Sequence, residues 1–164
     1  MDAQLLDQAN ALTPSQRVEL LEAAMLCFDQ VEIPLNHTFA HGVYMRHGEL
    51  PKGTLLIGME HRTDHLNVLL SGQITVLMDG ERTVFKAPCV FGARAGVRKV
   101  IRADEDSVLA NIHGTQTTDI DAIEAELVIE SETGRLHRVG QKSDLMLLAE
   151  NLLANGVALE QIGG

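Results

Sequence analysis

Alternating apolar and polar positions in the middle of the chain predict a fold made mainly of β-strands. The apolar runs there are short, rich in β-branched residues, and separated by turn signals such as Asp79-Gly80 and Ala95-Gly96. Many short strands with no helix between them are typical of an antiparallel sandwich or barrel. We therefore expect a β domain over residues 31–129, with one helical turn at residues 119–124. The expected strands are Phe39–His47, Thr54–Glu60, Leu66–Leu70, Gln73–Met78, Thr83–Ala87, Val90–Ala93, Lys99–Ala103, Ser107–His113 and Ala125–Ile129.

A helical arm is predicted at the N-terminus, over residues 1–30. Thr13 fits an N-cap, Pro14 fits the first turn and Gln16 completes a capping box, so a helix is expected over residues 14–28. A shorter helix is expected at Asp2–Leu12. Apolar residues recur at helical spacing and give the longer helix one apolar face, which needs a surface to lie on.

A second helical arm is predicted at the C-terminus, over residues 130–164. It begins with a linker at residues 131–135, and Ser143-Asp144 then starts a leucine-rich helix over residues 144–154. Burying one leucine side chain is worth roughly 1.5–3 kcal/mol, so this helix cannot favourably stay in water. We expect it to lie on its own barrel or on a neighbouring subunit, with both arms acting in assembly. The expected assembly contacts are Val18, Leu21, Met25, Leu145, Leu148 and Leu152.

Composition and charge narrow the class of partner. Of the 164 residues, 45% are hydrophobic but only 3% are aromatic, so we expect an aliphatic core. The formal net charge of −10 argues against nucleic acid or an anionic membrane as a direct partner. No apolar run approaches the roughly 18 residues that a membrane span requires. The first ten residues do not have the pattern of a leader. We therefore expect a soluble protein made in the cytoplasm of a host cell.

Two histidines next to an apolar strand give the first chemical signal. His61 and His65 lie four residues apart, a spacing that places both on one face of a strand. Nucleophilic catalysis has no support, because Ser71 and Cys89 lack a base at any recognisable spacing. Asp104-Glu105-Asp106 could bind Ca²⁺, but we expect three acids in a tight turn to form a solvated loop. Cys27 and Cys89 are expected to be reduced thiols.

The β domain resembles the cupin superfamily of small jelly-roll barrels over roughly residues 37–113. Cupins carry a first motif of two histidines one residue apart, a glutamate four residues later and a glycine seven beyond. A second motif has Pro-x-Gly and then a histidine three positions on. Aligned on Gly72, this chain has Met59, His61 and His65 at the first three ligand positions. Aligned on Ala95-Gly96, it has Lys99 at the last one.

A narrower resemblance links the chain to small cupin-like proteins encoded by tailed bacteriophages. It covers most of residues 37–127 and leaves out both arms. The segments that carry it include His37-Thr38-Phe39, Pro51-Lys52-Gly53-Thr54, His65-Leu66-Asn67, Gly72-Gln73-Ile74-Thr75-Val76, Ala95-Gly96-Val97-Arg98-Lys99 and Asp121-Ala122-Ile123-Glu124-Ala125. This resemblance implies a phage-encoded protein and, for some such proteins, a place in the virion.

The cupin resemblance also implies a third ligand, because its topology brings His113 near His61 and His65. Three histidines with an open fourth position would suit Zn²⁺ or Fe²⁺. The alternative is a set of imidazoles that hydrogen-bond inside a polar barrel or on its rim. Lys99 argues against a metal, since an ammonium beside a divalent cation is repelled unless it loses its proton.

Two functions from different classes follow. The leading hypothesis is a non-enzymatic structural component of a tailed-phage virion, located on the capsid, neck or tail and bound to other virion proteins. In it the barrel forms a homo-oligomer, a trimer or dimer, and needs no cofactor. The alternative is a metal-dependent or small-molecule-binding cupin enzyme that uses His61, His65 and His113 with Zn or Fe.

Overall fold

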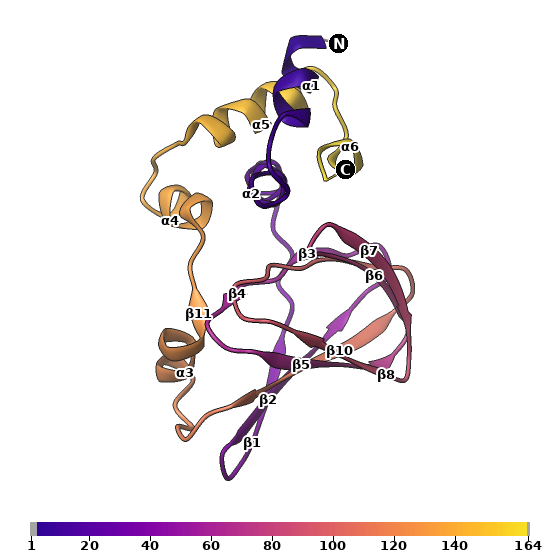
Figure 1. Ribbon diagram of the computed structural model, residues 1–164, viewed down its shortest axis with the longest axis vertical. Helices are drawn as coiled ribbons and strands as arrows, with labels where there is room; N and C mark the ends of the chain where they lie inside the picture. The colour runs from indigo at the N-terminus through magenta and orange to yellow at the C-terminus, as the bar shows by residue number, and fades with distance from the viewer. Residues whose placement is uncertain (1–2, 164) are drawn as a thin grey trace. The chain divides into compact units, whose positions relative to one another are not determined.

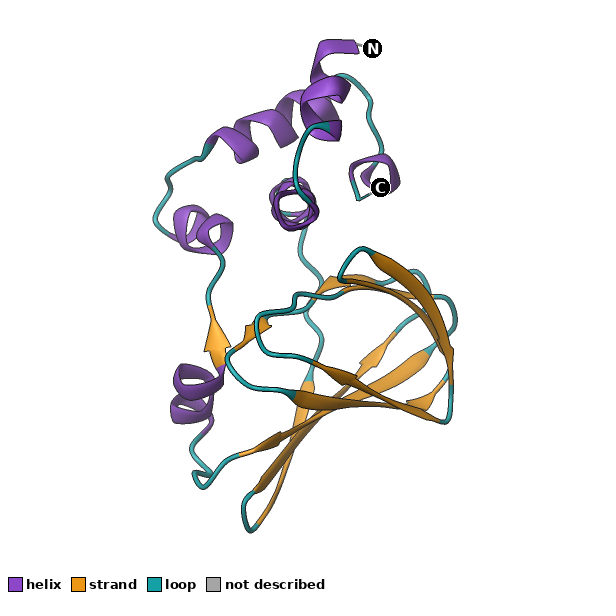
Figure 2. Cartoon of the chain, in the orientation of Figure 1, coloured by secondary structure: helices purple, strands orange, loops and turns teal. Residues whose placement is uncertain are grey.

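The computed structural model describes residues 3–163. In it the chain folds into two compact units. One unit holds residues 32–129, and the other joins the two ends of the chain, residues 3–31 and 130–163. Figure 2 shows strands in the first unit and only helices and loops in the second. Within the described residues, no helix is both long enough and apolar enough to cross a membrane.

The strands form two main antiparallel sheets and one short pair. The five-stranded sheet has the order β1 (Leu35–Ala40), β2 (Val43–Leu50), β10 (Ser107–Gly114), β5 (His65–Ser71) and β8 (Cys89–Ala93). The four-stranded sheet has the order β3 (Leu55–Ile57), β9 (Val100–Ala103), β6 (Gln73–Met78) and β7 (Glu81–Lys86). The short pair joins β4 (Glu60–His61) to β11 (Val128–Ile129).

The strand order is that of a jelly roll. If β1 and the short β4 and β11 are set aside, the remaining strands nest: β2 pairs with β10, β3 with β9, β5 with β8, and β6 with β7. Two four-stranded layers connected in this way are the jelly-roll arrangement. Figure 1 shows the two sheets facing each other across the barrel. The predicted fold class, a mainly β antiparallel jelly-roll barrel with helical arms, is confirmed.

Three strand predictions were wrong in part. Phe39–His47 is not one strand, because the chain reverses at His41-Gly42, where Gly42 has φ +74°, and continues as β2. The span Thr54–Glu60 is broken into β3 and the start of β4. Most of Ala125–Ile129 is helical, since α3 (Ile120–Leu127) extends the single turn expected before it.

Aliphatic side chains fill the barrel, as the low aromatic content predicted. The core cluster of the barrel comes from both sheets, and its buried members are Leu50, Leu69, Ile74, Val76, Ile101, Ala103 and Leu109. A smaller cluster lies beneath α3, where Ile123 and Leu127 pack with Tyr44. The side chain of Asp119 caps α3 by accepting a hydrogen bond from the backbone N–H of Ala122. The packing of Ile123 and Leu127 on Tyr44 seats α3 against the barrel.

The helical unit is built from both ends of the chain. Its helices are α1 (Ala3–Asn10), α2 (Pro14–Met25), α4 (Glu132–Arg138), α5 (Asp144–Ala154) and α6 (Leu159–Ile162). The predicted capping box of α2 is present, with Thr13 and Gln16 bonded in both directions. The helix predicted over residues 144–154 is also confirmed. The part of the expected first helix at Asp2 lies outside the described residues.

Two expectations about the arms are corrected. Residues 131–135 are not a linker, because Ser131 caps α4 by accepting the backbone N–H of Gly134. Nor does the C-terminal arm need the barrel or a neighbouring subunit to cover it, since α2 packs against α4, α5 and α6 of the same chain. None of the six expected assembly residues is exposed: Leu21 and Leu152 are buried, and Val18, Met25, Leu145 and Leu148 are half-buried. A role for these residues in assembly stays a prediction.

Candidate functional site

One end of the barrel interior is polar and the other is apolar. Residues that face the interior alternate along each strand, and the register of β5 with β10 shows the change. Leu69 lies opposite Leu109 in the apolar core. Two residues earlier in β5, Asn67 lies opposite Asn111. His65 lies two residues before Asn67, also points inward and is 5% exposed. The polar end is therefore made by the same periodicity that builds the core.

The structure brings the three predicted histidines together. His61 comes from β4, His65 from the start of β5 and His113 from the end of β10, and all three are buried. Their ring centroids are 4.4 Å apart for His61 and His65, 4.8 Å for His61 and His113, and 4.7 Å for His65 and His113. The expected proximity is found, but His61 and His65 lie on two strands, β4 and β5, and not on one face of a single strand as the spacing predicted. What the three histidines bind stays a prediction.

Lys99 lies in the same cluster and is 2% exposed. Its ammonium Nζ is 2.7 Å from Nε2 of His65 and 2.9 Å from Oδ1 of Asn67. The amide of Asn111 also donates to that Oδ1, at 2.6 Å. Because an ammonium can only donate, Nε2 of His65 must accept, so the ring proton of His65 lies on Nδ1, 3.4 Å from the carbonyl of Thr63. Lys99 therefore fixes the tautomer of His65.

Arg46 has the same effect on His61. It faces the interior from β2, in register with Asn111, and its Nη2 is 3.3 Å from Nε2 of His61. A guanidinium has no acceptor, so Nε2 of His61 accepts and Nδ1 carries the proton. That Nδ1 is buried and has no hydrogen-bond partner among the described residues, and the same holds for Nδ1 of His113. The cluster thus contains a buried donor without an acceptor.

Burial sets the charges of the cluster. Desolvation first, and the charges of neighbouring groups second, together lower the pKa of His61 to about 3 and those of His65 and His113 to about 4. Desolvation and then the charge of Arg46 lower the pKa of Lys99 to about 8. At pH 7 three neutral imidazoles therefore lie beside two cations. The ion pairs between described residues lie elsewhere, and no carboxylate neutralises Arg46 or Lys99.

This donor set does not fit a divalent cation. The Nε2 lone pairs of His61 and His65 are directed at Arg46 and Lys99, so a metal could take them only by displacing these cations. A metal bound there would also lie beside two positive charges with no carboxylate to offset them. Over residues 3–163, no three His, Cys, Asp or Glu side chains are arranged to hold a metal ion. The chemistry that the cluster offers is hydrogen-bond donation and positive charge.

The other sequence candidates lie away from this cluster. Met59, at the first ligand position of the cupin motif, is 43% exposed. Asp104, in the acidic turn, accepts hydrogen bonds from Thr75 and Arg102. Cys27 and Cys89 are both free thiols.

The sequence reasoning missed three members of the cluster, Arg46, Asn67 and Asn111. Asn67 had a detectable signal, because it stands two residues after His65 and so shares its face of the strand. Arg46 had no such signal, since the sequence pattern predicts one strand where the structure has the hairpin of β1 and β2. Asn111 becomes visible only through the register that places it between Arg46 and Asn67.

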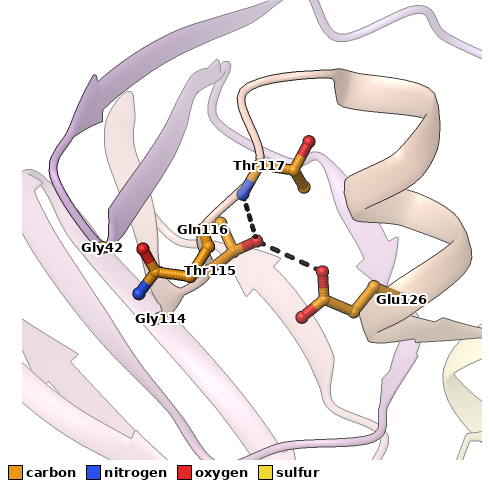
Figure 3. A pocket seen from close by; sticks show the side chains of 6 residues that line it. All are labelled: Gly42, Gly114, Thr115, Gln116, Thr117 and Glu126. Atoms are coloured by element: carbon orange, nitrogen blue, oxygen red, sulfur yellow. Dashed lines mark hydrogen bonds between the residues drawn. The ribbon is translucent and has the colours of Figure 1, made fainter.

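A separate open cavity of about 650 Å³ lies at the ends of β10 and α3 (Figure 3). Its lining residues are Gly42, Gly114, Thr115, Gln116, Thr117 and Glu126. The hydroxyl of Thr115 donates to Glu126 at 3.3 Å and accepts the backbone N–H of Thr117 at 3.3 Å. This cavity has one carboxylate, already hydrogen-bonded, and no buried titratable group. We therefore regard the histidine cluster as the candidate site.

Comparisons with known proteins found solved structures of low similarity to this chain. No family model matches the sequence, and no curated protein matches it. Among solved structures, KdgF from Halomonas sp. is 19% identical, with a TM-score of 0.47 over 56% of this chain and 88% of that one. An RmlC-like cupin from Shewanella frigidimarina is 17% identical, with a TM-score of 0.45 over 56% and 89%.

The cupin domain of Schizosaccharomyces pombe Cnp3 is also 17% identical, with a TM-score of 0.45 over 70% of this chain and 79% of that one. Nothing about activity follows from these likenesses. The jelly-roll assignment rests on the strand order of the chain itself.

Proposed function

We propose that this protein is a non-enzymatic structural component of a tailed-phage virion whose barrel associates with copies of itself. The observation that carries the self-association is the apolar outer face of the five-stranded sheet. The phage-like segments within residues 37–127 support the virion role. In the helical unit the two ends of the chain pack against each other. The barrel is then the part of each chain that contacts the next copy.

The strand register identifies which side chains form this outer face. Paired residues in an antiparallel sheet point to the same side, and the inward positions are known from the core. Two cross-strand rows point outward: Leu66, Ile112 and Met45 form one, and Val90, Val68 and the fully buried Ala110 form the other, which ends at His47 on β2. Leu66 is 49% exposed and Val90 is 61% exposed, so the face is open to solvent in the single chain.

The size and charge of this face favour a second copy as its partner. The rows cross β8, β5, β10 and β2, which lie side by side in Figure 1, so strands about 4.8 Å apart give a patch roughly 15 Å wide. Exposed apolar patches of a few hundred Å² commonly mark interaction sites. Two chains that each carry a net charge of −10 repel unless they meet through an uncharged face. A two-fold contact can pair the patch with itself.

The other sheet provides the contrast. On the outward side of its strand β7, Val84 is flanked by Arg82 and Lys86, and it pairs with Thr75 of β6. Val84 is 59% exposed, close to the value for Val90, but it lies among charges. The apolar character therefore belongs to one face of the barrel rather than to exposed strands in general.

Light scattering coupled to size exclusion tests the self-association. The full chain at micromolar concentration should have the mass of a dimer or trimer. Val90→Glu, alone or with Leu66→Glu, should shift the mass towards the monomer, because each contact would bury like charges. Val84→Glu is the matched control and should keep the wild-type mass. A monomeric wild-type chain, or equal masses for Val90→Glu and wild type, would refute the contact.

Mass spectrometry of purified particles tests the virion role. The chain should be present in gradient-purified virions of a phage that encodes it, in a fixed ratio to other structural proteins. Its presence only in the soluble lysate would refute the virion role while leaving the oligomer intact. The alternative, a small-molecule-binding cupin enzyme, draws its support from the buried cluster of His61, His65 and His113.

A further inference from the structure

The polar end of the barrel holds two cations that nothing in the described chain neutralises. Lys99 is almost completely buried, and Arg46 is half-buried beside His61. The charge of Arg46 acts on Lys99 and on all three imidazoles. Holding the buried ammonium of Lys99 beside a second cation is costly, and proteins usually offset such charges with an anion. The missing partner is thus a negative charge.

The hydrogen-bonding capacity of the cluster points the same way. Lys99 has three N–H donors, and two are used by His65 and Asn67. Arg46 has five donors, and its one hydrogen bond in the structure goes to His61. The Nδ1–H of His61 is a further buried donor with no acceptor. Neutral His113 adds one unused acceptor, but most of the unused capacity among the described residues of the cluster is donor capacity, which suits an oxyanion better than a cation.

We infer that the polar end of the barrel binds a small carboxylate, held by Lys99 and Arg46. Guanidinium and ammonium groups form short, charge-assisted hydrogen bonds with carboxylates. A monoanion is favoured over a phosphate dianion, because a buried site removes the ligand from water and that cost is greater for the higher charge. This binding site goes beyond the proposed structural role and does not depend on it.

Thermal unfolding of the dialysed full chain tests this inference. Formate, acetate and propionate are added at constant ionic strength, with sodium chloride and inorganic phosphate as comparison salts. Each carboxylate that fits should raise the Tm saturably, since a ligand that binds only the folded state stabilises it. The size of the largest effective carboxylate measures the room in the site. An equal rise with chloride would overturn the inference, and so would saturable binding of phosphate without binding of any carboxylate.

Variants locate the site. Lys99→Met should weaken carboxylate binding roughly tenfold or more, the effect of losing one charged hydrogen bond. Lys86→Met removes an exposed lysine from β7 and should leave the affinity unchanged. Arg46→Met provides a second variant at a half-buried position if Lys99→Met fails to fold. Unchanged carboxylate affinity in both Lys99→Met and Arg46→Met would overturn the assignment.

Imidazole NMR on the wild-type chain gives a readout that needs no variant. Formate should shift the imidazole resonances of His61 and His65 along a saturable curve that matches the Tm titration. Because Nε2 of His61 accepts from Arg46 and Nε2 of His65 accepts from Lys99, a carboxylate bound to these two cations changes the environment of both rings. The absence of any imidazole shift at a formate concentration that raises the Tm would place binding elsewhere and overturn the inference.

Discussion

Lys99 should make the stability of this protein depend on pH in an unusual direction. Burial lowers its pKa from 10.5 to about 8, so between these values the unfolded chain holds a proton that the folded chain has released. The free energy of unfolding must then rise with pH across this window. Below pH 8 the folded state carries the full cost of the buried charge, and above pH 10.5 that cost is gone.

The magnitude follows from the size of the shift. One pKa unit corresponds to about 1.4 kcal/mol, so a shift of this size is worth roughly 3 kcal/mol, most of it recovered between pH 7 and pH 10. The assay is urea unfolding of the dialysed protein at both pH values. The quantity compared is the change in unfolding free energy for wild type and for Lys99→Met. Tyrosine, cysteine and the other lysines titrate alike in both proteins, so their contributions cancel.

Wild type should gain about 2–3 kcal/mol relative to Lys99→Met as the pH rises from 7 to 10. Lys86→Met is the control, because it removes an exposed lysine from the same barrel and should follow the wild-type profile. Parallel profiles for wild type and Lys99→Met would refute the reasoning, since they would show that Lys99 is not held as a buried charge.

Other predictions follow from the packing. Leu69→Ala, at a fully buried core position, should lower the unfolding free energy by about 2–5 kcal/mol in urea, and a loss below about 1 kcal/mol would contradict the core assignment. Thr13→Ala should cost about 1 kcal/mol by the same assay through loss of the capping box, and an unchanged value would show that the cap does not stabilise the fold. His61→Ala should leave the fold and the oligomer mass unchanged, and elemental analysis of wild type should find less than one equivalent of Fe or Zn. A full equivalent that survives chelation and is released by this change would favour the enzyme instead. Ending the chain after Ile129 should keep a folded barrel by NMR but make α2 sensitive to protease, because α4, α5 and α6 cover it; a protected α2 would contradict that packing.

Much of the fold was readable from local chemistry. Strand β6, from Gln73 to Met78, matched its prediction residue for residue, because alternation between two turn signals leaves little freedom. The start of α2 was equally clear, since the Thr13 cap and Pro14 act within one helical turn. Signals of this kind involve neighbours in sequence and need no knowledge of the rest of the molecule.

The errors occurred where distant contacts decide the structure. Residues 131–135 contain a serine and a glycine and resembled a linker, but Ser131 caps a helix and also donates to Glu22, more than a hundred residues away. Ala125–Ile129 carries an apolar pattern that suits either a strand or a helix. Packing of Ile123 and Leu127 on Tyr44 selects the helix.

The sequence by itself determined the β-barrel class, the helical ends and the histidines that belong together. Only the tertiary structure decided the character of the site. His61 and His65 were predicted to share a strand face, but their meeting with Lys99, Arg46 and Asn67 depends on the register of β2, β10, β5 and β8. The charge state of such a cluster is set by burial and by neighbours far apart in sequence, and neither is encoded in the spacing of residues along the chain.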